Sequence, residues 1–569
     1  MAKKPANLIY GVDESPGPGS LLLLGFQHIF ILSIAFIFPV VIVDAIGGTP
    51  DQAQKLISTA MVATGIATIL QGLNNRYMGS GYLCPLLNGP AFLSASLLAG
   101  KAGGLSLIFG MTAIGGAFEA LFSRIVPRLR ALFPAEVTGT IVMMVGIEII
   151  PIAVTRFQGI DRTNITADPV AVTVGFITLI AMMGFNVWGK GKLRLYSVLI
   201  GMAIGYAAAS LTGILNAKHV GQLLNTPLFK TPSFGEYGLS FNVALLIPFL
   251  VATLSSALKT MGDLTICQKI NDTEWKRPDM KTISRGILAS SVGNLISGFT
   301  GALGQSVSSS NVGLSIATGA TSRRIAYSIG GILIFSAFFP RLASIFVIMP
   351  TPVMGASLIF AASFMILAGI QIITSRMIDA RKTFVIGISV VFGLSVDLVP
   401  GLFKHAHPWI QPFFSSSLSL ATVCAIILNL FLRIGISKSV EIELRPGVDS
   451  SDKIFTFMEH HGSQWGALKD VVYRVASVIN EFLESVAQSG ISKENLKVRV
   501  TFDEFNLDVY ISYKGLPVKF SEKQPSVAEL LQDENPLPAL SGFLMSKNTD
   551  SIKSSVDGEQ CKVHFHFDH

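Results

Sequence analysis

Long apolar runs fill the chain from Leu21 to Arg433. They recur at lengths of about 18 to 25 residues, which a helix needs to cross a hydrocarbon core of about 30 Å. We count about fourteen such segments, two of them short. The pattern predicts an all-α polytopic membrane domain over residues 21–435, preceded by a short segment of residues 1–20. That segment is polar and includes Lys3, Lys4 and Pro5, so we expect no cleavable signal peptide.

Two of the apolar segments are interrupted by glycine or proline, and they occupy corresponding places in two halves of the membrane domain. Residues 83–97 contain Pro85 and Pro90 and follow spans near 21–45 and 54–72. A second broken piece, residues 307–319, follows spans near 242–265 and 284–302. This arrangement predicts an inverted-repeat transporter with its substrate site between two half-helices near the bilayer midplane. Half-helix N-termini favour a ligand with carbonyl oxygens or negative charge.

Composition and charge support a membrane protein and fix its expected orientation. Half of the residues are hydrophobic and only 14% are charged, which excludes an ordinary soluble protein. Cations gather in alternate loops, for example at Arg76, Arg124 and Arg323, and are sparse in the loops between them. We therefore expect a multi-pass protein of the plasma or inner membrane with both termini in the cytoplasm. These loops account for the net charge of +7, so we expect no nucleic-acid partner.

The four cysteines show no spacing typical of a disulfide or a metal site. We expect them to be packing residues. They are Cys84, Cys267, Cys424 and Cys561.

Ordered motifs run through the membrane domain. They are GFQH at residues 25–28, PAEVTGT at 134–140, Gly262-Asp263, and a signature of Asn311, Gly313, Thr318 and Gly319. In this order they resemble the nucleobase/ascorbate transporters, also called the xanthine/uracil permease or nucleobase:cation symporter 2 family, over roughly residues 15–435. That family has Gln, Glu or Pro before the signature Asn, whereas this chain has Ser310.

The resemblance implies a fourteen-segment, seven-plus-seven inverted repeat. A core domain of spans one to four and eight to eleven would slide against a gate domain in an elevator mechanism, and the proteins would be homodimers packed through their gate domains. It implies secondary-active transport of a nucleobase coupled to H⁺ or Na⁺. It implies neither an enzyme nor a cofactor beyond the coupling ion.

The eighth span departs from the family at its substrate-binding position. Many members have there a Glu that accepts from the nucleobase ring, and this chain has Lys259. An ammonium donates and cannot accept, so the site should favour oxyanions or carbonyl-rich anions. Two interpretations remain open. Lys259 binds an anionic substrate or changes its protonation during transport, or it only forms an ion pair with Asp263 at i+4.

The other candidate residues also have two interpretations each. His28 is a substrate or proton group, or a core histidine hydrogen-bonded to the eighth span. Asn311 and Gly313 take part in transport and specificity, or Asn311 ties the tenth segment to its neighbours. Phe92 resembles an aromatic residue that stacks on the substrate, or it packs in the core. The hydroxyl run that includes Ser310 binds oxygens or Na⁺, or it permits close helix approach. We take Asp263 and His28 as the ion-coupling candidates.

After Arg433 the sequence changes to a charged, alternating pattern over residues 436–569, about the length of one small cytoplasmic α+β domain. The pattern predicts a helix over 468–489 and strands over 496–502, 507–513 and 563–567. His564 and His566 share one face of the last strand. We prefer exposed strand polarity over metal binding for that pair.

The order of these elements resembles the histidine-kinase-like ATPase fold in its anti-sigma-factor form. Ser485 stands where that family has a Mg²⁺-binding Asn, and Tyr513 stands where it has an adenine-binding Asp. The resemblance therefore implies a degenerate site and a regulatory or protein-docking module, with residues 520–540 as a lid-like loop.

The leading hypothesis is a secondary-active transporter of an oxidised or anionic purine, such as urate or xanthine, or of uracil. An alternative is an anion transporter or exchanger in which Lys259 anchors the anion. A third is a sensor whose tail signals when the membrane part binds a nucleobase.

Overall fold

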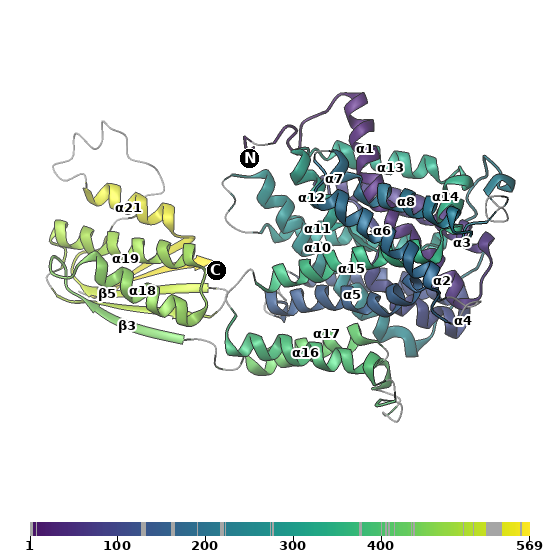
Figure 1. Ribbon diagram of the computed structural model, residues 1–569. Helices are drawn as coiled ribbons and strands as arrows, with labels where there is room; N and C mark the ends of the chain where they lie inside the picture. The colour runs from purple at the N-terminus through teal and green to yellow at the C-terminus, as the bar shows by residue number, and fades with distance from the viewer. Residues whose placement is uncertain are drawn as a thin grey trace. The chain divides into compact units, whose positions relative to one another are not determined.

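The structure is a computed structural model of the whole chain. It describes all residues except 1–3, 7, 127–131, 161–165, 191, 217–220, 222, 274, 276–277, 375–377, 400, 404–406, 408–409, 415, 434, 436–437, 493, 504–505, 519, 521–536, 558–559 and 569. The chain forms two compact units, one of Met1–Ile373 with Phe384–Ile427 and one of Thr374–Thr383 with Leu428–His569 (Figure 1).

The first unit is built of helices. They are α1 (Pro18–Leu32), η1 (Ser33–Phe36), α2 (Ile37–Ile46), α3 (Pro50–Gly72), η2 (Pro90–Phe92), α4 (Leu93–Ile125), α5 (Ala135–Phe157), α6 (Pro169–Val187), α7 (Lys192–Leu195), α8 (Ser197–Leu211), η5 (Val243–Leu245), α10 (Leu246–Asn271), α11 (Met280–Thr300), α12 (Ser309–Thr318), α13 (Arg324–Ser336), α14 (Pro340–Val347), α15 (Thr351–Ile373) and η6 (Gln411–Phe414). Helices α16 (Ala380–Leu398) and α17 (Ser417–Leu432) contain residues of both units.

Seven helical stretches among the described residues are long and apolar enough to cross a membrane. The pair α13 and α14 would add an eighth, although it is bent by 86° at its break. Helix α4 has 33 residues and is interrupted by Gly104, whose φ of 72° is left-handed. A continuous helix of that length would measure about 50 Å, more than the bilayer core, so the break divides it into two shorter segments. The predicted total of fourteen segments stays a prediction.

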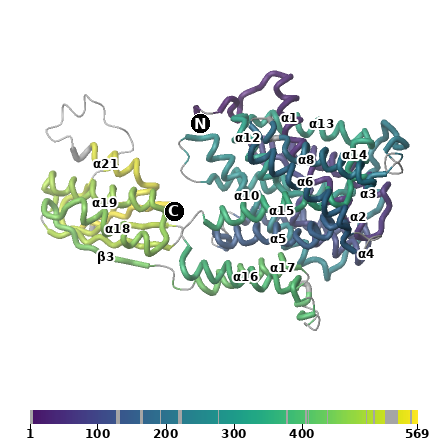
Figure 2. The backbone as a smooth tube through the Cα atoms, viewed as in Figure 1, coloured from purple at the N-terminus to yellow at the C-terminus, as the bar shows by residue number. Residues whose placement is uncertain are grey.

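Both predicted interruptions are present, and they meet. The first, residues 83–97, contains strand β1 (Leu86–Asn88), and the second, residues 307–319, begins at the last residue of strand β2 (Gln305–Val307). The strands pair antiparallel, with Leu86 opposite Val307 and Asn88 opposite Gln305. Helix α12, which follows β2, has only ten residues and ends at the left-handed Gly319. It contacts α10 and α1 (Figure 2).

Glycines let the helices around this strand pair approach closely. A Cβ on Gly298 of α11 would lie 2.8 Å from the carbonyl oxygen of Phe109 on α4. A Cβ on Gly116 of α4 would lie 3.0 Å from the carbonyl oxygen of Ser291. Such contacts stabilise membrane helices, which gain little from the hydrophobic effect when they associate in lipid.

The second unit contains a five-stranded antiparallel sheet in the order β3-β4-β5-β7-β6. Its elements are β3 (Lys438–Leu444), α18 (Ser451–Trp465), α19 (Lys469–Ser489), β4 (Leu496–Phe502), β5 (Asn506–Lys514), α21 (Leu537–Asn548), β6 (Ser551–Asp557) and β7 (Gln560–Asp568). The helices cover one face of the sheet (Figure 1). The buried core includes Val475 and Phe482 of α19 and Phe565 and Phe567 of β7.

The predicted helix over 468–489 and the three predicted strands are confirmed as α19, β4, β5 and β7. We did not predict β3, α18 or β6. Strand β6 is an edge strand with the sequence SIKSSVD, which has too few apolar residues for a clear period of two. Of the predicted lid-like loop, residues 521–536 lie outside the described residues.

Candidate functional site

The β1–β2 pair is held by backbone and side-chain hydrogen bonds. The Gly89 N–H donates to the Gly304 carbonyl at 2.7 Å, and the Ser308 N–H donates to the Pro85 carbonyl at 2.9 Å. From α10, Ser256 Oγ donates to the Gln305 carbonyl at 3.1 Å. The two broken segments therefore satisfy part of each other's backbone hydrogen bonds.

Phe92 packs directly on this backbone. Its side chain is 1% exposed. A Cβ added to Gly304 would lie 2.4 Å from Phe92 Cδ1, so the ring lies against the bare backbone that precedes β2. The ring therefore packs beside the strand pair.

Lys259 and Asp263 lie one turn apart on α10 and both contact the second broken segment. Lys259 Nζ donates to the Val307 carbonyl and lies 3.8 Å from Asp263 Oδ2. Asp263 Oδ2 also accepts from Ser309 Oγ at 2.9 Å. The two side chains are 15% and 6% exposed. Inserting such a cation into a membrane helix costs about 3 kcal/mol, and these two acceptors offset part of that cost.

The predicted Lys259–Asp263 pair is thus present, but the carbonyl is the closer partner. An ammonium has three N–H donors. Within the described part of the chain, the Val307 carbonyl accepts from one of them, and Asp263 at 3.8 Å is an ion-pair partner beyond hydrogen-bond distance. Donors of the ammonium are therefore available to a ligand without breaking the bond to Val307.

His28 and Asn311 are also joined. His28 Nδ1 lies 2.7 Å from Asn311 Oδ1, and Asn311 Nδ2 donates to Ser308 Oγ at 2.8 Å. Because Nδ2 of the amide is engaged with Ser308, Oδ1 accepts and the imidazole proton is on Nδ1. Both side chains are 0% exposed. One of the two interpretations of His28 had a core histidine hydrogen-bonded to the eighth span. Its partner is instead on α12, because α1 packs against α12 here.

Ser310 and Gly313 lie elsewhere on α12. Both are exposed, whereas Asn311, Val312 and Leu314 are buried. A Cβ on Gly313 would meet no atom within 4 Å. The structure therefore brings Lys259, Asp263, His28, Asn311 and Phe92 to the second broken segment and leaves Ser310 and Gly313 on the open face of its helix.

Glu119 on α4 is a residue that we did not single out from the sequence. Its Oε2 accepts from Asn294 Nδ2 on α11 at 2.7 Å. Asn294 Oδ1 in turn accepts from the Gln305 N–H at 2.6 Å, so the carboxyl is linked to β2. Among the described residues Glu119 Oε1 has no hydrogen-bond partner. An acidic residue inside an apolar run was the signal available in the sequence.

Comparison with known proteins identifies the family. The model of the Permease family, which covers xanthine and uracil permeases, matches residues 19–402. The chain belongs to this family. It is therefore a multi-pass membrane transport protein, and the resemblance seen in its motifs is confirmed.

Several relatives align over most of their length. A Clostridium perfringens protein, named as a candidate purine permease, is 29% identical over 75% of this chain and 93% of the relative. The xanthine permease XanP of Escherichia coli K12 is 26% identical over 75% of this chain and 94% of its own. The transmembrane domain of the cyanobacterial bicarbonate transporter BicA is a solved structure with 14% identity and a TM-score of 0.47, covering 74% of this chain and 100% of that domain.

Proposed function

We propose that the protein is a secondary-active transporter of an oxidised or anionic purine, such as xanthine or urate, or of uracil. The observation that supports this most directly is Lys259 beside the β1–β2 pair in a member of the Permease family, a cation whose one hydrogen bond among the described residues goes to the Val307 carbonyl. The names of the relatives, purine permease and xanthine permease, support the same substrate class.

The chemistry of the proposed site suits such a ligand. Purine-2,6-diones carry carbonyl oxygens and lose a ring proton readily, so an ammonium can donate to them where a carboxylate would be repelled. The first N–H groups of α12 have no partner within the helix and add positive potential at the same place. The ligand would lie between the strand pair, Lys259 and the N-terminus of α12, near Ser310 and Gly313.

The alternative function is anion transport or exchange with Lys259 as the anchor. The same charge reversal favours it, since no carboxylate stands at position 259 to accept from a nucleobase ring. Asp263, one turn away, favours the nucleobase over the simple anion. Its carboxylate can accept a hydrogen bond from a ring N–H, whereas it would repel a simple anion.

We further propose an elevator mechanism coupled to H⁺ or Na⁺, with fourteen segments in a seven-plus-seven inverted repeat and a homodimer packed through gate domains. The antiparallel pairing of β1 with β2 supports the repeat, because two inverted halves would place equivalent strands in that way. Asp263 and His28 are the proposed ion-coupling residues. Both termini would lie in the cytoplasm, with domains at residues 1–20, 21–435 and 436–569.

For the tail we propose a degenerate histidine-kinase-like module that docks a regulatory protein and does not bind ATP. Tyr513, at the expected adenine-binding position, is buried in the core and packs on Phe482 with ring centroids 5.6 Å apart. Its hydroxyl donates to the Leu516 carbonyl and accepts from the Val518 N–H. Saturable Mg²⁺-dependent ATP binding by the full chain would contradict this proposal.

Uptake into proteoliposomes tests the transport function. Radiolabelled xanthine should accumulate when a pH or Na⁺ gradient is imposed, and unlabelled urate or uracil should compete. Chloride, bicarbonate and sulfate should not compete at similar concentrations. If only the simple anions were bound or transported, the alternative function would replace the leading one.

A further inference from the structure

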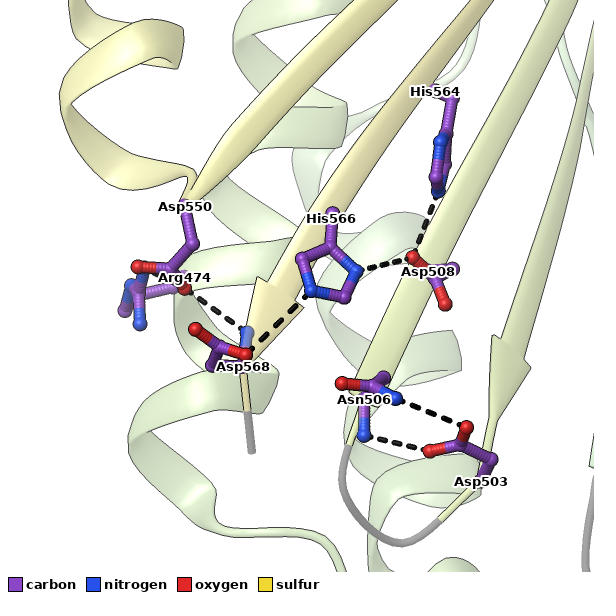
Figure 3. Close-up of polar contacts among 8 residues, drawn as sticks. All are labelled: Arg474, Asp503, Asn506, Asp508, Asp550, His564, His566 and Asp568. Atoms are coloured by element: carbon purple, nitrogen blue, oxygen red, sulfur yellow. Dashed lines mark hydrogen bonds and ion pairs between the residues drawn. The ribbon is translucent and has the colours of Figure 1, made fainter. Parts of the chain in front are cut away.

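Strand β7 of the tail domain has a polar face with two imidazoles. Phe565 and Phe567 alternate into the core, so His564 and His566 lie on the opposite face. Asp508 of β5 is directly opposite His566 in the antiparallel ladder. Figure 3 shows both rings directed at this carboxylate.

The potential metal-ligand atoms of Asp508, His564 and His566 lie close together. His564 Nε2 lies 2.8 Å from Asp508 Oδ1, and His566 Nδ1 lies 2.7 Å from the same oxygen. One donor atom from each residue can be chosen so that all three lie within 4.8 Å of one another. The side chains of His564, His566 and Asp508 are 27%, 28% and 19% exposed, so an ion can reach them from solvent.

We propose that Asp508, His564 and His566 bind a transition-metal ion of the Zn²⁺ class. Imidazole nitrogens and a carboxylate oxygen are ligands that Zn²⁺ accepts, and Mg²⁺ or Ca²⁺ would prefer oxygen alone. Three protein ligands leave a further position for water or for a side chain of a docked protein. The site is independent of the transport proposal.

Neighbouring groups contact both rings on the sides turned away from Asp508. The ring of Tyr510 stacks on His564, with centroids 4.5 Å apart and planes 4° apart. On the far side of His566, Nε2 lies 3.6 Å from Asp568 Oδ1. A carboxylate behind the second imidazole nitrogen is the usual outer partner of a metal-binding histidine.

The backbone that carries this outer carboxylate is held in place. The Asp568 N–H donates to Asp550 Oδ2 at 3.0 Å, and Asp550 pairs with Arg474 at 3.1 Å (Figure 3). Asp568 thus belongs to a network that starts on α19. We did not expect this from the sequence, where exposed strand polarity was the preferred interpretation of the two histidines.

The test uses the full-length protein in detergent, purified with a tag that contains no histidine and stripped with a chelator. Isothermal titration with Zn²⁺ should give one saturable equivalent per chain. Co²⁺ in its place should give the visible absorption of a low-symmetry, histidine-ligated site. The double variant His564→Gln/His566→Gln should lose this binding, and Asp568→Asn should weaken it about tenfold.

The matched control is His460→Gln/His461→Gln, which removes two neighbouring imidazoles from α18 of the same domain. It should leave the affinity unchanged. Asp508→Asn serves as a second ligand variant, since it retains an oxygen that accepts a hydrogen bond, and it should weaken binding while the thermal midpoint measured with chelator stays near that of wild type. Absence of a saturable equivalent, or equal loss in the α18 control, would overturn the proposal and leave only a hydrogen-bonded cluster.

Discussion

Lys259 and Asp263 hold the two sides of the bend between β2 and α12. The Lys259 ammonium donates to the Val307 carbonyl at the end of β2, and the Asp263 carboxylate accepts from Ser309 at the first turn of α12. Their own charged atoms are 3.8 Å apart, a loose contact beside these hydrogen bonds. The pair therefore positions the second broken segment and presents a charge to it at the same time.

Replacing Lys259 should change which substrates compete. Lys259→Met removes the ammonium but retains an unbranched side chain, so urate, an anion at neutral pH, should lose about ten- to hundredfold in affinity. Neutral uracil should change less. Competition against xanthine uptake measures both.

The control for that variant is Lys269→Met, on the last turn of the same helix, where the side chain is exposed. It should leave both affinities unaltered. Equal effects of Lys259→Met on urate and uracil would mean that the ammonium has only a structural role.

An added methyl should lower thermal stability at one glycine near the site and leave it unchanged at another. Gly304→Ala places a Cβ 2.4 Å from Phe92, so we expect a loss of about 1–3 kcal/mol from overpacking or a displaced ring. Gly313→Ala meets no atom within 4 Å and should retain thermal stability. Thermal unfolding in detergent measures this difference.

The KM for uptake by the Gly313→Ala variant tests where the ligand lies. If substrate lies against the open face of α12, Gly313→Ala should raise KM although the protein is stable. Normal KM and kcat for this variant would place the ligand elsewhere.

Asn311→Ala should lower the unfolding temperature of the protein. It removes the partner of His28 Nδ1 and of Ser308 Oγ at once, and a buried polar group left without a partner costs about 1–3 kcal/mol. Ser310→Ala, at the exposed neighbouring position, is the control and should unfold at the wild-type temperature. Similar midpoints for the two variants would show that the His28–Asn311 contact contributes little.

Glu119 should tolerate replacement by glutamine better than loss of its hydrogen bond. Glu119→Gln retains an oxygen that accepts from Asn294, whereas Glu119→Ala leaves a cavity and removes the closer acceptor of the Asn294 amide, which then has only Gln305 as partner among the described residues. We expect the alanine variant to lose about 2–4 kcal/mol more than the glutamine variant. If both variants had wild-type stability, the Glu119–Asn294–Gln305 link would be unimportant for the strand pair.

Tyr513 should make the tail domain sensitive to alkaline pH. Burial raises the pKa of its phenol to about 12, whereas the unfolded chain has the ordinary value near 10. Between these values the unfolded state releases the proton first, so the free energy of unfolding is retained below pH 10 and decreases as pH rises towards 12. Tyr513→Phe should reduce this dependence, as measured by urea unfolding of the protein followed by fluorescence at pH 9 to 12; the pKa of Tyr510, also raised by burial, accounts for a remainder. Tyr473→Phe is the control, since that side chain is 52% exposed.

Local patterns in the sequence were sufficient to predict much of this protein. The apolar runs, the two interruptions and the helix over Lys469–Ser489 depend on periodicity and on glycine or proline within a few residues. The position of Lys259 one turn before Asp263 also follows from helix geometry alone. The edge strand β6 was missed because its sequence has no such period.

Contacts between distant segments depended on the tertiary structure. The sequence does not show that Leu86 pairs with Val307, that His28 meets Asn311 across 283 positions, or that Asp508 lies between two histidines of another strand. Hydrophobic periodicity specifies which face of an element is buried, and many registers satisfy it equally. Only the packing of all elements together selects one register, and with it the partner of each polar side chain.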